Sequence, residues 1–301
     1  MSNKLNIVFF GSSDFSVPAL HALYNCKDIV IKYVVTKQDK EVGRRQHVKP
    51  NIVALHATKL KIPVLKVTNL VKNPKQLDKI NFKNIDFAVV VSFGYIIPPK
   101  ILCQLPNRFI NLHASLLPKY RGASPVQQAV INGDMVTGNS IIVLQKEVDS
   151  GPILSQKSYK VEKTQTIDKI FAFLADKGAK LLVNTLIAHS KGKIKPIEQQ
   201  HSKATFTKIF TKNDGFVTLT EKPLDIYNKY RALKIWPQVY TTVANLEQFA
   251  SIKTKIADKK TLVKLTELML KNNETLQIVK LQLPNKAPIG YKDFINGYKT
   301  N

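Results

Sequence analysis

The chain has 301 residues, of which 44% are hydrophobic, so it can bury a substantial core in one large domain or two. No run of about 18 apolar residues is present, so no membrane span or membrane partner is expected, and the two isolated cysteines, Cys26 and Cys103, exclude a disulfide framework and fit a reducing cytoplasm. The net charge of +25 favours a polyanionic partner, although only five of the 46 basic residues are Arg and part of the excess suits solvated Lys surfaces.

The N-terminal part of the chain alternates short apolar runs with helical patterns. The first apolar run ends at Gly11, which is typical of the loop after a strand. We therefore interpret this run as a first β-strand and not as a signal peptide. This alternation predicts an α/β fold with a Rossmann-like, mostly parallel sheet covered by helices, over residues 1–189. The strands are expected at residues 5–10, 29–35, 86–91, 108–113 and 139–144, and the main helices at 16–24 and 166–188.

The remainder of the chain has a different pattern. Residues 190–207 are polar and rich in Lys, Gln and Ser, so we interpret them as a linker. Residues 208–301 begin with a helix and continue with short alternating segments, which predicts a second domain built as a small β-barrel. Its strands are expected at residues 239–243, 261–265 and 275–283.

The strand at residues 108–113 ends with a pair of polar side chains. Asn111 and His113 are two residues apart and therefore point to the same side, while Leu112 points to the other. An Asn can donate to a developing oxyanion, and a His can donate as well or move a proton. The carboxylate of Asp149 would orient and charge the imidazole if the fold brings it near. No other His has metal-ligand spacing with His113, so no metal is expected.

Three further segments are candidates for binding. Gly11 and Ser12 lie between the first strand and a helix, where backbone N–H groups face ligands in open α/β sheets, or they form a plain turn. The polar insertion at residues 37–50 contains Arg44 and Arg45 and suits phosphate contact, or it is a solvated loop. Residues 92–98 form a loop that is too apolar for a free surface, so it binds a ligand or anchors itself to the core. Neither Gly-x-Gly-x-x-Gly nor Gly-Lys-[Ser/Thr] follows the first strand, which disfavours a nicotinamide or ATP enzyme.

These motifs together carry a family resemblance. The run Asn-x-His-x-Ser-Leu-Leu-Pro-x-x-x-Gly at residues 111–122, followed by Asp-Ser-Gly at 149–151, resembles the formyltetrahydrofolate-dependent formyltransferases. Within that family the likeness is greatest to the enzymes that formylate methionyl-tRNA. It covers nearly the whole chain, because further matching blocks occur in the family's order. They are Phe10-Gly11-Ser12, Gly43-Arg44-Arg45, and residues 92–98, 121–127 and 231–237.

The resemblance implies a function and a set of site residues. The expected reaction is formyl transfer from 10-formyltetrahydrofolate to the α-amino group of methionyl initiator tRNA, in the cytoplasm, by a monomer with an OB-like C-terminal domain that binds tRNA. The implied catalytic residues are Asn111, His113 and Asp149. The implied tRNA contacts are Gly11, Ser12, Arg44 and Arg45. The implied folate contacts are Phe93, Gly94, Tyr95, Ile96, Ser115, Leu116, Leu117 and Pro118.

Two other functions stay open on the sequence alone. One is a formyltransferase with a small acceptor, either a nucleotide-linked amino sugar or phosphoribosyl-glycinamide; the latter enzymes are shorter than this chain. The other is a noncatalytic tRNA-binding protein on the same scaffold, against which the intact set of Asn111, His113 and Asp149 argues.

Overall fold

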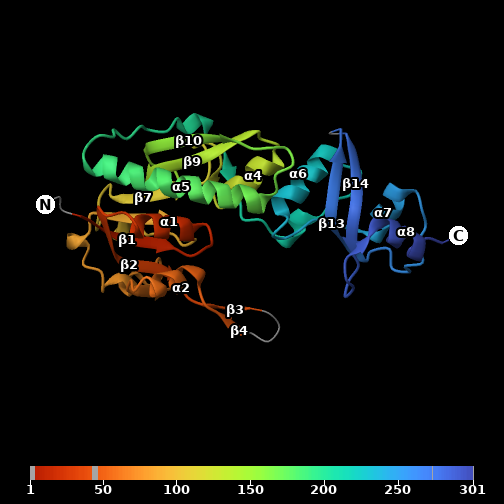
Figure 1. Cartoon of the computed structure of the whole chain (residues 1–301), viewed down its shortest axis with the longest axis horizontal. Helices are drawn as coiled ribbons and strands as arrows, with labels where there is room; N and C mark the ends of the chain where they lie inside the picture. The colour runs from red at the N-terminus through yellow and green to blue at the C-terminus, as the bar shows by residue number, and fades with distance from the viewer. Residues whose placement is uncertain (1–3, 43–46, 273, 301) are drawn as a thin grey trace. The chain divides into compact units, whose positions relative to one another are not determined.

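The computed structural model describes residues 4–42, 47–272 and 274–300, and the chain divides into two compact units (Figure 1). The first unit comprises Met1–Pro125, Val136–Lys160 and Phe171–Thr207. The second comprises Val126–Met135, Val161–Ile170 and Lys208–Asn301.

The first unit is built on one large sheet, seven-stranded within the described residues, with the order β10-β9-β7-β6-β1-β2-β5. Neighbouring strands from β7 to β5 run parallel, whereas β9 is antiparallel to β7 and β10 is antiparallel to β9. The strand bounds are β1 Leu5–Gly11, β2 Ile29–Lys37, β5 Val64–Val67, β6 Phe87–Val91, β7 Phe109–His113, β9 Val136–Val143 and β10 Ile153–Lys160. A short hairpin, β3 Lys40–Val42 and β4 His47–Lys49, forms a separate sheet.

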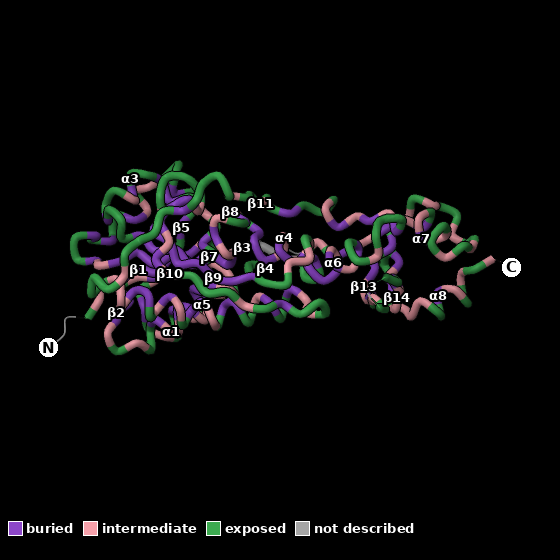
Figure 2. Tube along the Cα trace, turned by 90° about the horizontal axis from the view of Figure 1, so that it is seen from above, coloured by how far each residue is buried: buried purple, intermediate pink, exposed green. Residues whose placement is uncertain are grey.

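Both faces of this sheet are covered, which explains why β6 and β7 are apolar or buried at every position. One face packs against α1 (Ser16–Tyr24), α2 (Ile52–Lys59) and α5 (Ile167–Ser190). The other face packs against α3 (Pro99–Leu102) and the short 3₁₀ turns Pro74–Leu77 and Phe82–Asn84. Figure 2 shows the resulting buried strands inside an exposed outer layer.

The parallel strands end together at one edge of the sheet. Gly11 at the end of β1 pairs with Val91 at the end of β6, and Val91 pairs with Leu112 near the end of β7. The loops that follow these strands therefore start side by side, at the carboxyl edge where open α/β sheets bind ligands. This register places the loops that start at residues 12, 92 and 114 around one site.

The second unit has its own core and an antiparallel sheet of order β12-β13-β14-β15, four strands among the residues described. The strands are β12 Tyr240–Thr242, β13 Leu262–Lys271, β14 Thr275–Gln282 and β15 Ile289–Gly290. Helices α6 (Pro223–Leu233), α7 (Val243–Ala250) and α8 (Tyr291–Tyr298) complete this part, and α4 (Pro125–Ile131) lies almost wholly in the same unit. The mostly parallel α/β fold is confirmed, and the antiparallel sheet is consistent with the small barrel-like domain that was expected.

A buried arginine joins two segments of the second unit. The Arg231 side chain on α6 is 1% exposed, and its Nε donates to Asn228 Oδ1 at 2.9 Å. Its Nη1 donates to the carbonyl oxygens of Glu162 and Gln165 at 3.2 and 3.3 Å. Burial lowers the pKa of Arg231 from its ordinary value. These bonds hold the start of α5 to α6 within the unit.

We expect Arg231→Met to lower the free energy of unfolding of this unit by roughly 1–3 kcal/mol, because Met keeps the bulk but removes the donor of the buried Asn228 amide oxygen and of the half-buried Gln165 carbonyl. Urea denaturation followed by the fluorescence of Trp236, the single tryptophan and a residue of the same unit, measures the change. The matched control is Arg108→Met, since Arg108 is exposed and also donates to a carbonyl, that of Ile85. Equal midpoints for Arg231→Met and the wild type would refute the structural role.

Candidate active site

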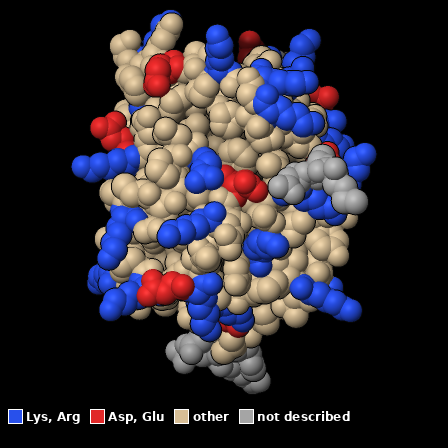
Figure 3. Space-filling view, turned by 90° about the vertical axis from the view of Figure 1, so that its left-hand side faces the viewer, with Lys and Arg blue, Asp and Glu red and all other residues tan. Residues whose placement is uncertain are grey.

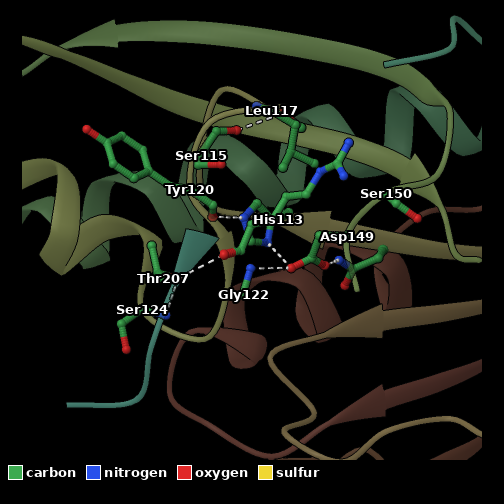
Figure 4. A network of polar contacts seen from close by, with 12 residues as sticks. His113, Ser115, Leu117, Tyr120, Gly122, Ser124, Asp149, Ser150 and Thr207 are labelled. Carbon is green, nitrogen blue, oxygen red and sulfur yellow. Dashed lines mark hydrogen bonds and ion pairs between the residues drawn. The ribbon is translucent and has the colours of Figure 1, made fainter. Parts of the chain in front are cut away.

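The site forms at the end of β7, where Asn111 and His113 project from one face of the strand. Figure 4 shows His113 beside Asp149 and Gly122. Both side chains are nearly buried, with Asn111 8% and His113 6% exposed. Phe109 shares this face and belongs to the core under it, while Ile110 and Leu112 pack into the core on the opposite face. Because side chains alternate between the two faces of β7, Asn111 and His113 lie at the edge of the apolar core on the same face as Phe109.

His113 is held between two oxygen atoms. Its Nε2 donates to the carbonyl oxygen of Tyr120 at 2.9 Å, and its Nδ1 lies 3.4 Å from Asp149 Oδ2. A carbonyl oxygen only accepts hydrogen bonds, and so does a carboxylate. The arrangement is therefore satisfied on both sides when the ring carries a proton on each nitrogen.

Asp149 connects three parts of the site. Its Oδ2 accepts a hydrogen bond of 2.8 Å from the backbone N–H of Gly122 in addition to facing His113. Its Oδ1 accepts from Asn111 Nδ2 at 3.4 Å, a long bond that leaves the amide loosely engaged. The structure therefore brings Asn111, His113 and Asp149 together. Gly122 and Tyr120, which supply backbone partners, could not be identified from side-chain chemistry, although both lie in the matched 111–122 run.

The turn after β7 is fixed by internal hydrogen bonds. Ser115 Oγ donates to the carbonyl of Lys119 at 2.7 Å, and Ser140 Oγ donates to the carbonyl of Ser115 at 2.6 Å. Leu117 donates its N–H to Ser140 Oγ, and its carbonyl accepts from Gln156 Nε2. Ser115 and Leu117 are buried, whereas Leu116 and Pro118 are half-buried. Among the folate contacts expected in this turn, Leu116 and Pro118 are therefore the more accessible to a ligand.

The loop after β6 presents a mixed surface. Phe93 is 2% exposed and packs edge-on against Phe10, so it anchors the loop to the core. Tyr95 packs edge-on against Phe93 and lies under the ammonium of Lys37 at 4.3 Å. Gly94 is exposed, and Ile96 is 66% exposed. Phe93 therefore anchors the loop, while Gly94 and Ile96 are exposed to solvent.

The loop after β1 is tied to its neighbours. A Cβ on Gly11 would meet Phe9 and Ser16, so only glycine fits there. Ser12 Oγ accepts from the backbone N–H of Lys37 at 3.1 Å, and the Ser12 carbonyl accepts from Asn51 Nδ2. Arg44 and Arg45, the other expected tRNA contacts, lie outside the described residues.

A cavity of about 530 Å³ opens on the same side of β7. Phe109, on the face that carries Asn111 and His113, is one of its walls. Residues 144–147, which lead directly to Asp149, form another. His201 forms part of the lining as well. The remaining lining residues belong to α3 and to the segment that follows it: Pro99, Leu102, Cys103, Leu105, Pro106 and Asn107. The sequence did not identify these residues as ligand contacts, although the position of 144–147 next to Asp149 is a usable signal.

Three further observations concern metal clusters, membrane spans and the distribution of surface charge. No cluster of three or more His, Cys, Asp or Glu residues suited to hold a metal ion occurs in the described ranges. In the same ranges, no helix has the length and apolar character needed to span a membrane. On the face seen in Figure 3, Lys and Arg side chains are spread widely with few acidic ones between them. The net charge alone therefore does not locate a binding surface.

Comparison with known proteins identifies relatives along the full length of the chain. A methionyl-tRNA formyltransferase of Sulfurihydrogenibium sp. is 34% identical over 310 residues. The alignment covers 98% of this chain and 97% of that relative. A second, from Caldicellulosiruptor saccharolyticus, is 34% identical over 312 residues with the same coverage.

Solved structures share the fold at lower identity. The sugar 3N-formyl transferase WlaRD, crystallised in the presence of dTDP and 5-N-formyl-THF, matches with a TM-score of 0.61 at 17% identity, over 99% of this chain and 96% of its own. The N-formyltransferase of Helicobacter canadensis, in complex with folinic acid and dTDP-3-aminofucose, matches with a TM-score of 0.62 at 16% identity, over 99% and 97%.

The family models agree with these relatives. The model described as formyl transferase matches residues 5–186, which include β7 and the Asp149 loop, and the model of the formyl transferase C-terminal domain matches residues 209–299. The chain belongs to the formyl transferase family.

Proposed function

We propose that the chain transfers a formyl group from 10-formyltetrahydrofolate to the α-amino group of methionyl initiator tRNA, the reaction that prepares this tRNA for translation initiation. The observation that carries the proposal is the convergence of Asn111, His113 and Asp149 at the end of β7. The full-length likeness to methionyl-tRNA formyltransferases supports this acceptor. The sugar formyltransferases share the fold at 16–17% identity, and a likeness at this level gives no information about the acceptor.

The chemistry follows from the charges around β7. The lone pair of the unprotonated amine attacks the formyl carbon, and the carbonyl electrons move onto oxygen to form a tetrahedral oxyanion. When this intermediate collapses, the bond to N10 of the folate breaks, the amine loses a proton and N10 gains one. Asn111 is the donor best able to turn toward the oxyanion, because its bond to Asp149 is long. The His113 imidazolium, paired with Asp149, adds positive charge; it would donate a proton to N10 as the bond to the formyl carbon breaks, and the neutral imidazole then accepts the proton that the amine loses.

The cavity beside β7 is the proposed place of the folate ring system. It is large enough for a bicyclic ring, is lined by Leu102, Leu105 and Phe109, and opens on the face that carries the catalytic side chains. The loop residues Phe93–Ile96 and the turn residues Ser115–Pro118 remain proposed contacts for the rest of the donor. The side chains of Ser115 and Leu117 are buried and the backbone groups of Leu117 are bonded to Ser140 and Gln156, so Leu116 and Pro118 are the more direct of the proposed turn contacts.

The tRNA is proposed to contact two other parts of the chain. Gly11 and Ser12 lie at the carboxyl edge of the sheet, where the acceptor end must come to reach His113. Arg44 and Arg45 would bind phosphates, and residues 208–301 would bind the tRNA body, with residues 1–189 carrying catalysis and 190–207 linking them. We further propose that the enzyme acts as a monomer in the cytoplasm.

We expect Asn111→Ala and His113→Ala each to lower kcat by about 100-fold or more, since one lost oxyanion donor costs roughly 3–4 kcal/mol. Asp149→Asn should bind both substrates normally and lose rate, because the amide keeps the shape of the carboxylate without its charge. Steady-state kinetics with methionyl-tRNA and 10-formyltetrahydrofolate measure these changes, with circular dichroism as the control for folding. Wild-type turnover in folded His113→Ala or Asn111→Ala would rule out the assigned site.

The proposed tRNA contact of Arg44 gives a separate prediction. Arg44→Ala should raise KM for methionyl-tRNA without changing KM for the folate or the thermal midpoint, because a guanidinium binds phosphate through two parallel hydrogen bonds. Arg44→Lys should recover only part of the loss. The comparison is made at low and moderate salt, since phosphate contacts weaken as salt rises and the many Lys residues compensate at low salt. Unaltered tRNA kinetics at both salt concentrations would show that Arg44 does not contact the tRNA.

A further inference from the structure

The polar segment that ends at Thr207 is attached to the site turn. Its last residues form β11, Phe206–Thr207, which pairs in parallel with β8, Arg121–Gly122. The carbonyl and hydroxyl of Thr205 accept hydrogen bonds of 2.8 Å from the N–H groups of Arg121 and Tyr120. Tyr120 and Gly122 supply the backbone partners of His113 and Asp149. The segment is therefore packed directly behind the catalytic residues.

Gln199 is the residue of this segment that reaches deepest. It is 5% exposed, and its Nε2 donates to the carbonyl of Asp149 at 2.9 Å and to the carbonyl of Gly151 at 2.7 Å. Its Oε1 accepts from Arg121 Nε at 3.1 Å and Nη2 at 2.7 Å. A carboxamide offers two donor hydrogens and two acceptor lone pairs, so every hydrogen-bonding position of Gln199 is used.

The backbone that Gln199 holds is in an uncommon conformation. Asp149 has φ of +49°, in the left-handed region that residues other than glycine adopt only when their surroundings enforce it. The two carbonyls bound by Gln199 belong to Asp149 and Gly151, so the bonds fix the backbone on both sides of Ser150, directly after the Asp149 Cα. Gly151 itself lies against the Val143 carbonyl so closely that no Cβ would fit. A left-handed Asp149 turns its carboxylate toward Gly122 and His113.

We propose that Gln199 is a positioning residue for formyl transfer: its carboxamide fixes the Asp149 loop to the Arg121 side chain, and so fixes the carboxylate against His113. This inference rests on the proposed function of the same site. The hydrogen bonds of Gln199 go to backbone carbonyls and to Arg121, so its effect on the catalytic side chains passes through the backbone of Asp149. A displacement of about 1 Å in a reacting group can cost about 100-fold in rate.

The test uses Gln199→Glu and Gln199→Met in the full-length protein. Glu keeps an acceptor for Arg121 but cannot donate to the two carbonyls, and Met removes both functions while keeping the length of the side chain. Each variant should lower kcat by at least about tenfold and change KM for either substrate by less than about twofold. The matched control is Gln200→Glu, because Gln200 is exposed and adjacent, and it should match the wild type.

A double-mutant cycle separates positioning from a general structural role. If Gln199 acts through Asp149, adding Gln199→Glu to Asp149→Asn should cost less than about threefold further, because the group that it positions no longer functions. Full additivity, a change confined to KM, or wild-type kcat in both Gln199 variants would overturn the proposal. If Gln199→Glu does not fold, the cycle is run with Gln199→Met.

His113→Ala in the same assay keeps the two proposals apart. If His113→Ala is inactive while both Gln199 variants are normal, the positioning role fails and the proposed function stands. If His113→Ala turns over normally, the assigned site is wrong, and the inference about Gln199 is overturned with it.

Discussion

The contact between Asp149 Oδ2 and its two partners is the constraint on which the site of the first unit depends. The carboxylate accepts from Gly122 N–H at 2.8 Å and faces His113 Nδ1 at 3.4 Å. These groups come from β7, from the turn after it and from the loop between β9 and β10. No single element could supply them, so the site exists only when the sheet, the turn and the loop are all in place.

The sheet topology explains how the loop reaches β7. Because β9 is antiparallel to β7, it ends beside the beginning of β7, with Val143 paired to Ile110. The loop at residues 144–152 then runs along β7, brings Asp149 to His113, and comes back to the end of β9, where Ile153 of β10 pairs with Ile142. The same path leaves the 530 Å³ cavity between residues 144–147 and α3. The loop at the antiparallel edge of an otherwise parallel sheet thus supplies both the contact of Asp149 with His113 and one wall of the cavity.

The sequence predicted what depends on local periodicity and missed what depends on loops. Asn111 and His113 share a face because side chains alternate along any strand, and the structure agrees. The strand expected at residues 261–265 is longer, Leu262–Lys271, because irregularities in its pairing after Leu265 break the alternation. Gln199 could not be recognised within a polar segment, since its partner Arg121 lies 78 residues away and their contact exists only in three dimensions.

The measurement that tests the account most directly compares acceptors in one assay. The purified chain is given 10-formyltetrahydrofolate and either methionyl initiator tRNA or a dTDP-linked amino sugar, and the rate of formyl transfer to each acceptor is recorded. The account predicts a kcat/KM for methionyl-tRNA at least about 100-fold higher than for the sugar, because the tRNA is proposed to engage Arg44, Arg45 and residues 208–301 in addition to the site at His113. A higher kcat/KM for the amino sugar, or no transfer to the tRNA at all, would contradict it.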